Sequence, residues 1–242
     1  MADAVKSGDK GRGIIQEVFG KIPLPAECDS FDPNYDKYWE KRISDDVYTE
    51  PARRKAEGIK DYINLGESLL DVGCGTGDSL EYLRETREIE GTGLDISDTA
   101  LAVTSAKGFK TLNVDLTDME NKLDSIYDHI VLFEVAEHII NAEIMMMKLK
   151  GKYRKGLYVS TPNLGYIAHR FRLMFGRFPL TYISDPREHI RYWTVKDFLD
   201  WSDWLGFKRP QVLGIRGKVK VFGLPARWPT LWASEVVFRF TP

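Results

Sequence analysis

Cysteine is scarce in this chain, and long apolar runs are absent. The 242 residues include only two cysteines, Cys28 and Cys74, which lie far apart in the sequence. This argues against a disulfide scaffold and against a zinc site made of cysteines. No apolar segment approaches the roughly 18 residues that a membrane-spanning helix requires, and the first residues lack the apolar core of a secretion signal. We therefore expect a cytoplasmic protein of a reducing compartment.

A strong net charge is missing as well. Lys and Arg together number 34 and Asp and Glu 36, which gives a formal charge of −2 at pH 7. Such a chain has no general attraction for nucleic acid or for an anionic membrane. We expect no nucleic-acid partner, and the sequence leaves the oligomeric state open. The hydrophobic content of 43% is enough for a globular core.

Short apolar segments alternate with helical patterns through the middle of the chain. The expected strands cover residues 68–73, 91–96, 109–116, 129–134 and 155–162. The expected helices cover residues 33–43, 50–66, 78–86, 98–108, 137–153 and 194–207. Strands separated by helices predict βαβ units and a parallel sheet that is covered on both faces. Strand-like segments at 210–217, 218–223 and 234–240 could add antiparallel edges.

Two segments depart from this alternation. Residues 1–30 mix Gly, Lys, Asp and Pro with one short apolar patch, and we expect them to form a mobile N-terminal arm. Residues 31–242 are expected to form a single domain. Residues 163–193 are rich in aromatic residues and arginine, and we expect them to form an inserted lid over the substrate.

The segment "LLDVGCGTGDSLEYL" places three glycines at alternate positions directly after an expected strand. Glycine lets the backbone turn sharply and approach a ligand without interference from a Cβ atom. A plain strand–helix turn would explain one of these glycines easily. Gly73, Gly75 and Gly77 together predict a ligand-binding turn.

The acidic residues of this turn favour a cationic ligand. A dinucleotide-binding turn has its third small residue where this chain has Asp78. A carboxylate at the start of the helix would repel a pyrophosphate, and Asp71 before the turn adds to this effect. The turn contains no lysine, so it does not fit a Walker-type phosphate site. These features favour S-adenosylmethionine, which carries a cationic amine and a sulfonium, over NAD.

Two further aspartates close the next two expected strands. Asp95 ends "GTGLDI", where a carboxylate can accept hydrogen bonds from both hydroxyls of a ribose. Asp115 in "NVDL" is placed to meet an adenine amino group. Each alone could be a solvated loop residue. Their order at the ends of successive strands supports a nucleoside site, because open α/β sheets bind ligands at those ends.

Four segments together resemble motifs one to four of class I S-adenosylmethionine-dependent methyltransferases. They are "LLDVGCGTG", "GTGLDIS", "NVDL" and "YDHIVLFEVAEHI". The resemblance spans residues 68–140 and implies an α/β, Rossmann-like, seven-stranded and mostly parallel sheet with helices on both faces. Residues 160–207 resemble, more loosely, the MetW-like branch (methyltransferase type 11), some members of which are associated with a partner acyltransferase. The cofactor-binding residues that this resemblance implies are Asp71, Gly73, Cys74, Gly75, Gly77, Asp95, Ile96, Asp115, Leu116, Phe133 and Glu134.

Two glutamates and a histidine follow the fourth expected strand. Glu134, Glu137 and His138 stand at positions i, i+3 and i+4, which one face of a helix would bring together. In one interpretation Glu134 lies near the cofactor and the other two only begin a helix, where glutamate complements the dipole. In the other, all three bind a divalent cation such as magnesium, which would orient a substrate oxygen and lower its pKa. The E-x-x-E-H pattern resembles the metal-associated motif of ubiquinone-pathway O-methyltransferases.

His138 and His189 are the candidate catalytic residues. Methyl transfer from a sulfonium requires an aligned, deprotonated nucleophile and a dry pocket. His189, in "EHIRYW", could remove the proton of an acceptor hydroxyl at the mouth of the pocket. Its alternative role is to anchor a loop.

Arginines and aromatic residues are concentrated between residues 166 and 193. Arginine binds phosphate or carboxylate through forked hydrogen bonds, and aromatic rings give a pocket apolar walls. We expect this lid to enclose a small acceptor, which its arginines would allow to be anionic. The segment "YDKYWEKR", with Tyr35, Tyr38, Trp39 and Arg42, would either close the opposite side of the cofactor pocket or serve only for packing. The residues expected to bind the acceptor are Tyr38, Trp39, Arg170, Arg191 and Tyr192. The alternative to a lid is a structural cap whose rings pack together and whose arginines face water.

The sequence thus predicts an S-adenosylmethionine-dependent methyltransferase. The expected acceptor atom is an oxygen, or less readily a nitrogen, of a small molecule, a sugar or a lipid headgroup. A rival from another class is a non-catalytic partner of a biosynthetic enzyme that keeps the fold for binding. An NAD-dependent enzyme is disfavoured by Asp78.

Overall fold

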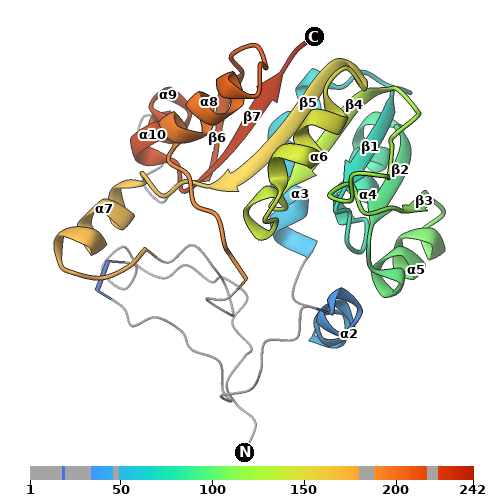
Figure 1. The fold of residues 1–242 in the computed structure, drawn as a ribbon, viewed down its shortest axis with the longest axis horizontal. Coiled ribbons are helices and arrows are strands. Elements are labelled where there is room, and N and C mark those ends of the chain that lie inside the picture. The colour runs from blue at the N-terminus through green and yellow to red at the C-terminus, as the bar shows by residue number, and fades with distance from the viewer. Residues whose placement is uncertain (1–17, 20–33, 46–48, 180–187, 217–222) are drawn as a thin grey trace, which may run out of the picture.

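A seven-stranded sheet forms the centre of the molecule (Figure 1), in the order β3-β2-β1-β4-β5-β7-β6. The structure is a computed structural model that describes residues 18–19, 34–45, 49–179, 188–216 and 223–242. The strands are β1 Ser68–Val72, β2 Glu90–Asp95, β3 Lys110–Asn113, β4 Tyr127–Phe133, β5 Tyr153–Pro162, β6 Gln211–Arg216 and β7 Glu235–Phe240.

The sheet is mostly parallel. All neighbouring strands from β3 through β5 run parallel, and β7 runs antiparallel to both β5 and β6. The expected α/β, Rossmann-like architecture is therefore confirmed, as is an antiparallel strand from residues 234–240. The strand-like segment at 218–223 lies almost wholly outside the described residues.

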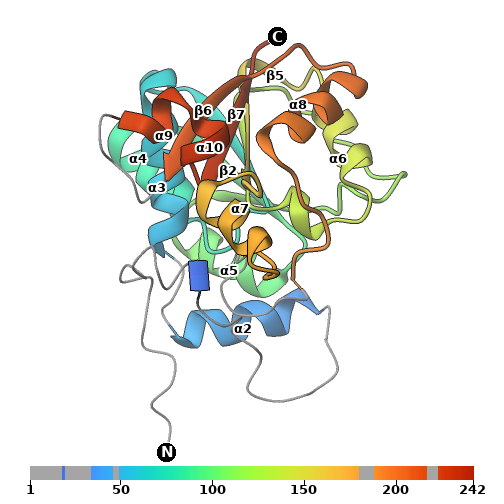
Figure 2. The same cartoon turned by 90° about the vertical axis from the view of Figure 1, so that its left-hand side faces the viewer.

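Helices cover both faces of the sheet, because successive strand residues alternate between the faces. Leu69 and Val131 pack with α3, α4 and α5, whereas Leu70 and Ile130 pack with α6 and α8. Figure 2 shows α3 and α4 on one side of the sheet and α6 and α8 on the other. These helices are α3 Thr49–Ile59, α4 Asp78–Arg87, α5 Asp98–Ala106, α6 Ala142–Leu149 and α8 Val195–Trp204.

The carboxyl ends of β1, β2 and β4 meet at one edge of the sheet. The chain leaves β1 toward β2 and β3 and returns to pair β4 with the other side of β1. Such a reversal of strand order opens a crevice at the carboxyl edge. The helix α2 (Tyr35–Asp45) lies beyond this edge in both views (Figures 1 and 2).

The helix expected over residues 137–153 is wrong at both ends, since α6 ends at Leu149 and Tyr153 begins β5. The chain forms one 3₁₀ turn, η2 (Ala136–His138), becomes extended at Ile139 and begins α6 only at Ala142. Glu134, just after β4, has a left-handed φ of 54°, which a right-handed helix does not accommodate. Glu134, Glu137 and His138 therefore do not share a helix face.

The remaining elements complete the described chain. They are η1 Lys60–Tyr62, α7 Ile167–Met174, α9 Leu224–Arg227 and α10 Pro229–Trp232. None of the described helices is long and apolar enough to cross a membrane. The expected arm, residues 1–30, lies outside the described residues except for Val18 and Phe19. Its separation from residues 31–242, and the lid over residues 163–193, stay predictions.

Candidate functional site

The glycine turn between β1 and α4 adopts a conformation that requires glycine. Gly73, Gly75 and Gly77 have φ values of 71°, 52° and 75°, a region that side chains with a Cβ rarely enter. A Cβ atom at Gly73 would lie 2.4 Å from Val135, and one at Gly75 would lie 2.4 Å from the Trp39 ring. The turn is thus closely packed on both sides.

Asp95 anchors this turn to the end of β2. Its carboxylate accepts hydrogen bonds from the backbone N–H of Gly75 at 2.9 Å and of Ser97 at 3.0 Å. Burial raises the pKa of Asp95, although these two amides oppose the effect. The structure therefore presents a buried carboxylate beside the turn, as the sequence predicts.

Asp71 at the end of β1 is also buried. Ser79, in the first turn of α4, donates a hydrogen bond to its carboxylate. Burial raises the pKa of Asp71 to about 7, in spite of the hydrogen bond from Ser79. A cation placed in the crevice would hold this carboxylate in its charged form.

Asp78 does not contribute the free negative charge that the sequence argument assigns to it. Its Oδ1 atom lies 2.7 Å from the ammonium of Lys107, and Thr76 donates a hydrogen bond to its Oδ2 atom. The lysine neutralises the carboxylate at the helix start. The argument against a pyrophosphate therefore depends on Asp71 and Asp95 rather than on Asp78.

The other residues expected to bind the cofactor are distributed over the same region. The Asp115 carboxylate accepts hydrogen bonds from the backbone and hydroxyl of Thr117, and Ile96 is exposed at 43%. Leu116 is buried in the hydrophobic core, which speaks for a packing role. Cys74 is buried as well, and burial raises the pKa of its thiol far above its usual range.

The helix α2 packs over the glycine turn. Trp39 packs against Gly75, and the Asp36 carboxylate accepts hydrogen bonds from the Ser97 hydroxyl at 2.6 Å and the Thr99 amide at 3.0 Å. The sequence assigns Trp39 to the acceptor, whereas the structure places it against the turn expected to bind the cofactor. The Tyr38 ring lies under the Arg42 guanidinium, 3.5 Å from its centroid.

Glu134 occupies a strained position at the end of β4. A left-handed φ in a non-glycine residue costs about 1–3 kcal/mol. Two hydrogen bonds with Ser160 hold Glu134 in this conformation. The Ser160 hydroxyl lies 2.9 Å from both the backbone nitrogen and Oε1 of Glu134. The buried ammonium of Lys55 lies 3.9 Å from the same carboxylate. Strain of this kind concentrates at functional sites.

Glu137, His138 and His189 meet next to Glu134. One ligand atom from each of the three lies within 4.8 Å of the others, and the two imidazole rings are 4.6 Å apart, edge to face. Burial lowers the pKa of His138 to about 4. Burial also lowers the pKa of His189, and together with the charge of the neighbouring His138 it brings this pKa to about 3. Burial and the charge of Glu134 raise the pKa of Glu137 well above its usual range.

The grouping differs from the expected metal set in one member. The sequence joins Glu134, Glu137 and His138, whereas the cluster of converging ligand atoms has His189 in place of Glu134. Two backbone bonds explain the change, because Ile190 and Arg191 donate their amides to the Glu137 carbonyl at 3.0 and 3.1 Å. These bonds are non-local, so spacing along the chain could not reveal them.

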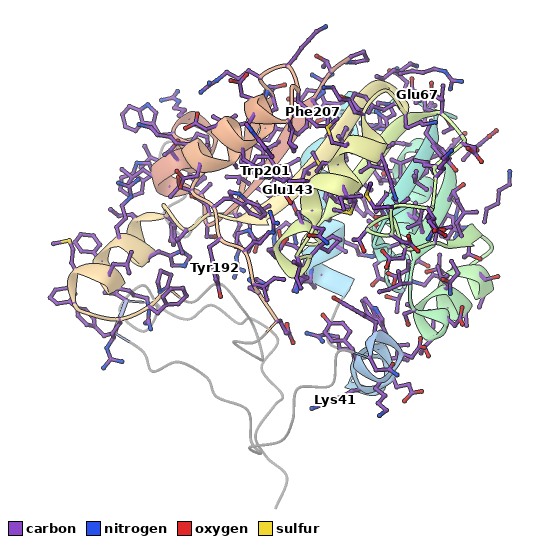
Figure 3. The ribbon with its side chains drawn as sticks, viewed as in Figure 1. Lys41, Glu67, Glu143, Tyr192, Trp201 and Phe207 are labelled. Carbon is purple, nitrogen blue, oxygen red and sulfur yellow. The ribbon has the colours of Figure 1, made fainter. Side chains whose placement is uncertain are left out.

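In the expected lid, the two candidate arginines bind other residues of the chain, whereas Tyr192 is exposed. Arg191 forms a bidentate pair with Glu143, whose Oε1 atom also accepts from the Trp201 indole at 2.8 Å. Figure 3 shows Glu143 and Trp201 side by side. Arg170 donates to the Gly165 carbonyl at 2.6 Å. These contacts favour a structural role for both arginines.

Tyr192 keeps an exposed position beside the histidine cluster. Its hydroxyl donates to the His189 carbonyl at 2.9 Å, and its ring is 37% exposed. Phe133, at the end of β4, is partly buried against the core. Tyr192 is therefore available to a ligand without any rearrangement of the described residues.

Two further residues of the segment "YDKYWEKR", Tyr35 and Arg42, help to build this region. Burial raises the pKa of Tyr35, and so do the charges of Asp95, Glu188 and Asp115, which places Tyr35 over the crevice. Arg42 pairs with Glu188 at 3.1 Å and so connects α2 to the segment that carries His189. The helical pattern of residues 33–43 predicts α2, but the pairing of Arg42 with Glu188 is non-local, so spacing along the chain could not reveal it.

Comparisons with known proteins agree with this geometry. A family model described as "Methionine biosynthesis protein MetW" matches residues 53–240. A solved structure of an S-adenosylmethionine-dependent methyltransferase from Archaeoglobus fulgidus superposes with a TM-score of 0.60. It is 16% identical and the match covers 84% of this chain and all of that one. At this identity the likeness shows the fold.

Two curated relatives match over part of their length. (S)-tetrahydroprotoberberine N-methyltransferase from Eschscholzia californica is 30% identical over 142 residues, which are 56% of this chain and 38% of that protein. The bifunctional methionine biosynthesis protein MetXA/MetW from Rhodopirellula baltica is 24% identical over 119 residues, 46% of this chain and 19% of that protein. The chain thus spans less than half the length of either relative.

Proposed function

Because the chain belongs to the family of the methionine biosynthesis protein MetW, we propose that it is an S-adenosylmethionine-dependent methyltransferase. Its acceptor is an oxygen of a small molecule, a sugar or a lipid headgroup, and it acts in the cytoplasm. The pair of buried carboxylates beside the glycine turn is the observation that carries the proposal. Buried Asp71 and Asp95 flank the glycine turn, whose glycine positions leave no room for a side chain. The turn lies at the edge where such sheets bind ligands.

The donor side of the site follows from this crevice. S-adenosylmethionine, when bound, supplies an electrophilic methyl group on a sulfonium. Asp95 would accept hydrogen bonds from the ribose hydroxyls, and Asp115 would face the adenine amino group. The turn from Gly73 to Gly77 leaves room for the methionine part, while Asp71 complements the positive charge. Trp39 would exclude water from the turn.

The acceptor side is formed by the histidine cluster and its neighbours. His138 and His189 are neutral near pH 7, because their pKa values are about 4 and about 3. Each imidazole therefore keeps a lone pair, which can either accept a hydrogen bond from an acceptor hydroxyl or bind a metal ion that holds this hydroxyl. Tyr38 and Tyr192 would give the pocket aromatic walls. Arg170 and Arg191 would favour an anionic acceptor only if they exchanged their present partners.

A nitrogen acceptor and a non-catalytic role are the two alternatives. The name of the Eschscholzia californica relative indicates methyl transfer to nitrogen. The Rhodopirellula baltica relative carries both MetXA and MetW in its name, which supports a role as partner of a biosynthetic enzyme. We prefer oxygen, because a buried cluster of carboxylate and imidazole suits a hydroxyl that must lose a proton.

Calorimetry with S-adenosylmethionine and with NAD tests the donor. We expect S-adenosylmethionine to bind and NAD to give no heat of binding. Asp95→Ala should weaken the binding at least tenfold, since it removes the acceptor of the ribose hydroxyls. Asp98→Asn, three residues further on in the exposed start of α5, is the matched control and should bind as the wild type. Binding of NAD, or refusal of S-adenosylmethionine, would overturn the proposal.

Formation of S-adenosylhomocysteine separates an enzyme from a non-catalytic partner. The protein is incubated with S-adenosylmethionine and fractions of a cell extract as the source of acceptors. We expect one fraction to give S-adenosylhomocysteine and a product that carries the methyl group on oxygen, identified by mass spectrometry. Binding without turnover in any fraction would support the partner role.

A further inference from the structure

Glu137, His138 and His189 are brought together by the backbone rather than by chance side-chain positions. Glu137 and His138 lie on η2, while His189 lies about fifty residues further along the chain. The amides of Ile190 and Arg191 both bind the Glu137 carbonyl, so the segment that carries His189 is docked on η2 by two hydrogen bonds. The convergence of the three ligand atoms within 4.8 Å is therefore built into the fold.

Buried polar atoms of this cluster lack partners. Glu137 is 1% exposed, and among the described residues no donor reaches either of its carboxylate oxygens. The Nδ1 atom of His189 is likewise buried without a hydrogen bond in the described part of the chain. Buried polar groups are almost always satisfied, and a buried carboxylate is costly unless it is paired or binds a metal. These atoms point to a missing ligand, and a cation is the ligand that would pair with the Glu137 carboxylate.

His138 is oriented as histidine ligands of metal ions usually are. Its Nδ1 atom lies 2.8 Å from the Glu188 carbonyl. A carbonyl can only accept, so Nδ1 carries the proton and Nε2 keeps its lone pair. Metal-binding histidines typically make this outer hydrogen bond, which fixes the ring and its tautomer. Arg42 in turn pairs with the Glu188 side chain at 3.1 Å.

We infer that Glu137, His138 and His189 bind a divalent transition-metal ion, such as Mn²⁺ or Zn²⁺, that holds two adjacent oxygens of the methyl acceptor. Two imidazoles and one carboxylate favour such an ion over magnesium, which prefers oxygen ligands. Three protein ligands leave coordination positions open. A vicinal diol or a catechol would fill two of them, and the ion would lower the pKa of the oxygen to be methylated.

Glu134 is a neighbour of this site rather than a required ligand. The Ser160 hydroxyl donates a hydrogen bond to its carboxylate and the Lys55 ammonium lies 3.9 Å away, whereas neither carboxylate oxygen of Glu137 has a hydrogen bond among the described residues. The identity of the acceptor as a diol rests on the proposed function. The presence of the ion does not, because the three ligands converge independently of the donor crevice.

Titration of the chelator-treated full chain with Mn²⁺, followed by electron paramagnetic resonance, tests the site. We expect one ion to bind per chain, and Mg²⁺ to displace it at least tenfold less effectively than Zn²⁺. Glu137→Gln and His189→Ala should each weaken Mn²⁺ binding at least tenfold. Glu67→Gln is the matched control, since Glu67 also contacts a histidine, His129, at 2.6 Å but lies before β1 at the opposite edge of the sheet. Figure 3 shows Glu67 at the opposite end of the molecule from Lys41, which lies on α2.

The outcomes separate this inference from the proposed function. Failure of the wild type to bind Mn²⁺ or Zn²⁺, or unchanged binding in both variants, would overturn the metal site even if S-adenosylmethionine binds. Calorimetry with S-adenosylmethionine on Glu137→Gln checks that this variant is folded. Catechol should change the spectrum of the bound Mn²⁺, while phenol, which offers a single oxygen, should not. Equal effects of catechol and phenol, or no effect of either, would overturn the two-oxygen acceptor.

Discussion

Gly75 in the glycine turn is required both for its backbone conformation and for the close contact it makes, and experiment can separate these two requirements. Gly75 has a left-handed φ and also faces the Trp39 ring at 2.4 Å from the position of a Cβ atom. Gly151 has a left-handed φ of 76° but no atom within 4 Å of that position. The two glycines therefore differ in contact while sharing the same kind of backbone conformation.

Gly75→Ala should cost more than Gly151→Ala. Backbone strain alone is worth about 1 kcal/mol for alanine at such a φ, and we expect this loss in both variants. Gly75→Ala must also displace Trp39, so it should weaken S-adenosylmethionine binding at least tenfold, while Gly151→Ala leaves it unchanged. Denaturant unfolding and calorimetry measure the two effects. Equal affinities in the two variants would contradict the close packing at Gly75.

Trp39→Ala should open the turn to water. The ring is partly buried over Gly75, so its loss removes the apolar cover of the crevice. We expect about a tenfold rise in the dissociation constant for S-adenosylmethionine, measured by calorimetry. Trp204→Ala, whose ring is 74% exposed on α8, serves as the control. If both variants bind equally well, α2 does not cover the donor.

At the scale of elements, the starts of α8 and α6 show when the local sequence determines where a helix begins. Thr194 and Asp197 form a capping box at the start of α8, in which each side chain bonds the other's backbone amide. Asn141 before α6 makes no such side-chain bond. The sequence accordingly predicts the start of α8 correctly and the start of α6 wrongly.

Thr194→Ala should destabilise the protein by about 1 kcal/mol, the usual value of an N-cap side chain. In a domain of this size that corresponds to a fall in melting temperature of about 2–4 °C. Thr194→Ser keeps the hydroxyl and should melt close to the wild type. Thermal unfolding followed by circular dichroism measures the difference. A serine variant as unstable as the alanine variant would assign the loss to the methyl group.

On the scale of the whole molecule, the two edges of the sheet carry different polar networks. The carboxyl edge holds Asp71, Asp95 and Glu137, and the Glu137 carboxylate has no hydrogen bond among the described residues. The amino edge holds Glu67, which accepts hydrogen bonds from Asn64 and Lys155 and contacts His129. The network around Glu67 is satisfied and stabilises the fold, whereas the unpaired atoms of Glu137 and His189 are those that we propose bind a ligand.

Glu67→Gln should remove an acid-sensitive part of the stability. Burial alone would raise the pKa of Glu67, but hydrogen bonds from Lys155, Asn64 and His129 outweigh it and lower the pKa to about 2, from 4.5. A lowered pKa in the folded state stabilises the protein above the unfolded value and loses this contribution as the pH falls toward 2. Urea unfolding of wild type and variant should differ most near pH 7 and converge from about pH 4.5 to pH 2. A constant difference would contradict this.

How far the site could be predicted depends on how local its parts are. Gly73, Gly75, Gly77 and Asp95 lie directly at strand ends, so a pattern within a few residues identifies them. The acceptor role expected of Trp39 stays a prediction. Its packing on the glycine turn could not be predicted, because the docking of α2 depends on partners of Asp36 and Arg42 far along the chain. Asp78 was expected to be a free charge, but Lys107 lies on the neighbouring helix end.

The sequence by itself determined the alternation of strands and helices, the glycine turn and the acidic strand ends. Each of these follows from backbone sterics and from side-chain periodicity over a few residues. Only the tertiary structure decided that His189, rather than Glu134, joins Glu137 and His138. That choice depends on two backbone hydrogen bonds across about fifty residues and on a left-handed turn at Glu134. Contacts over such distances are set by packing of the whole chain, which local patterns do not encode.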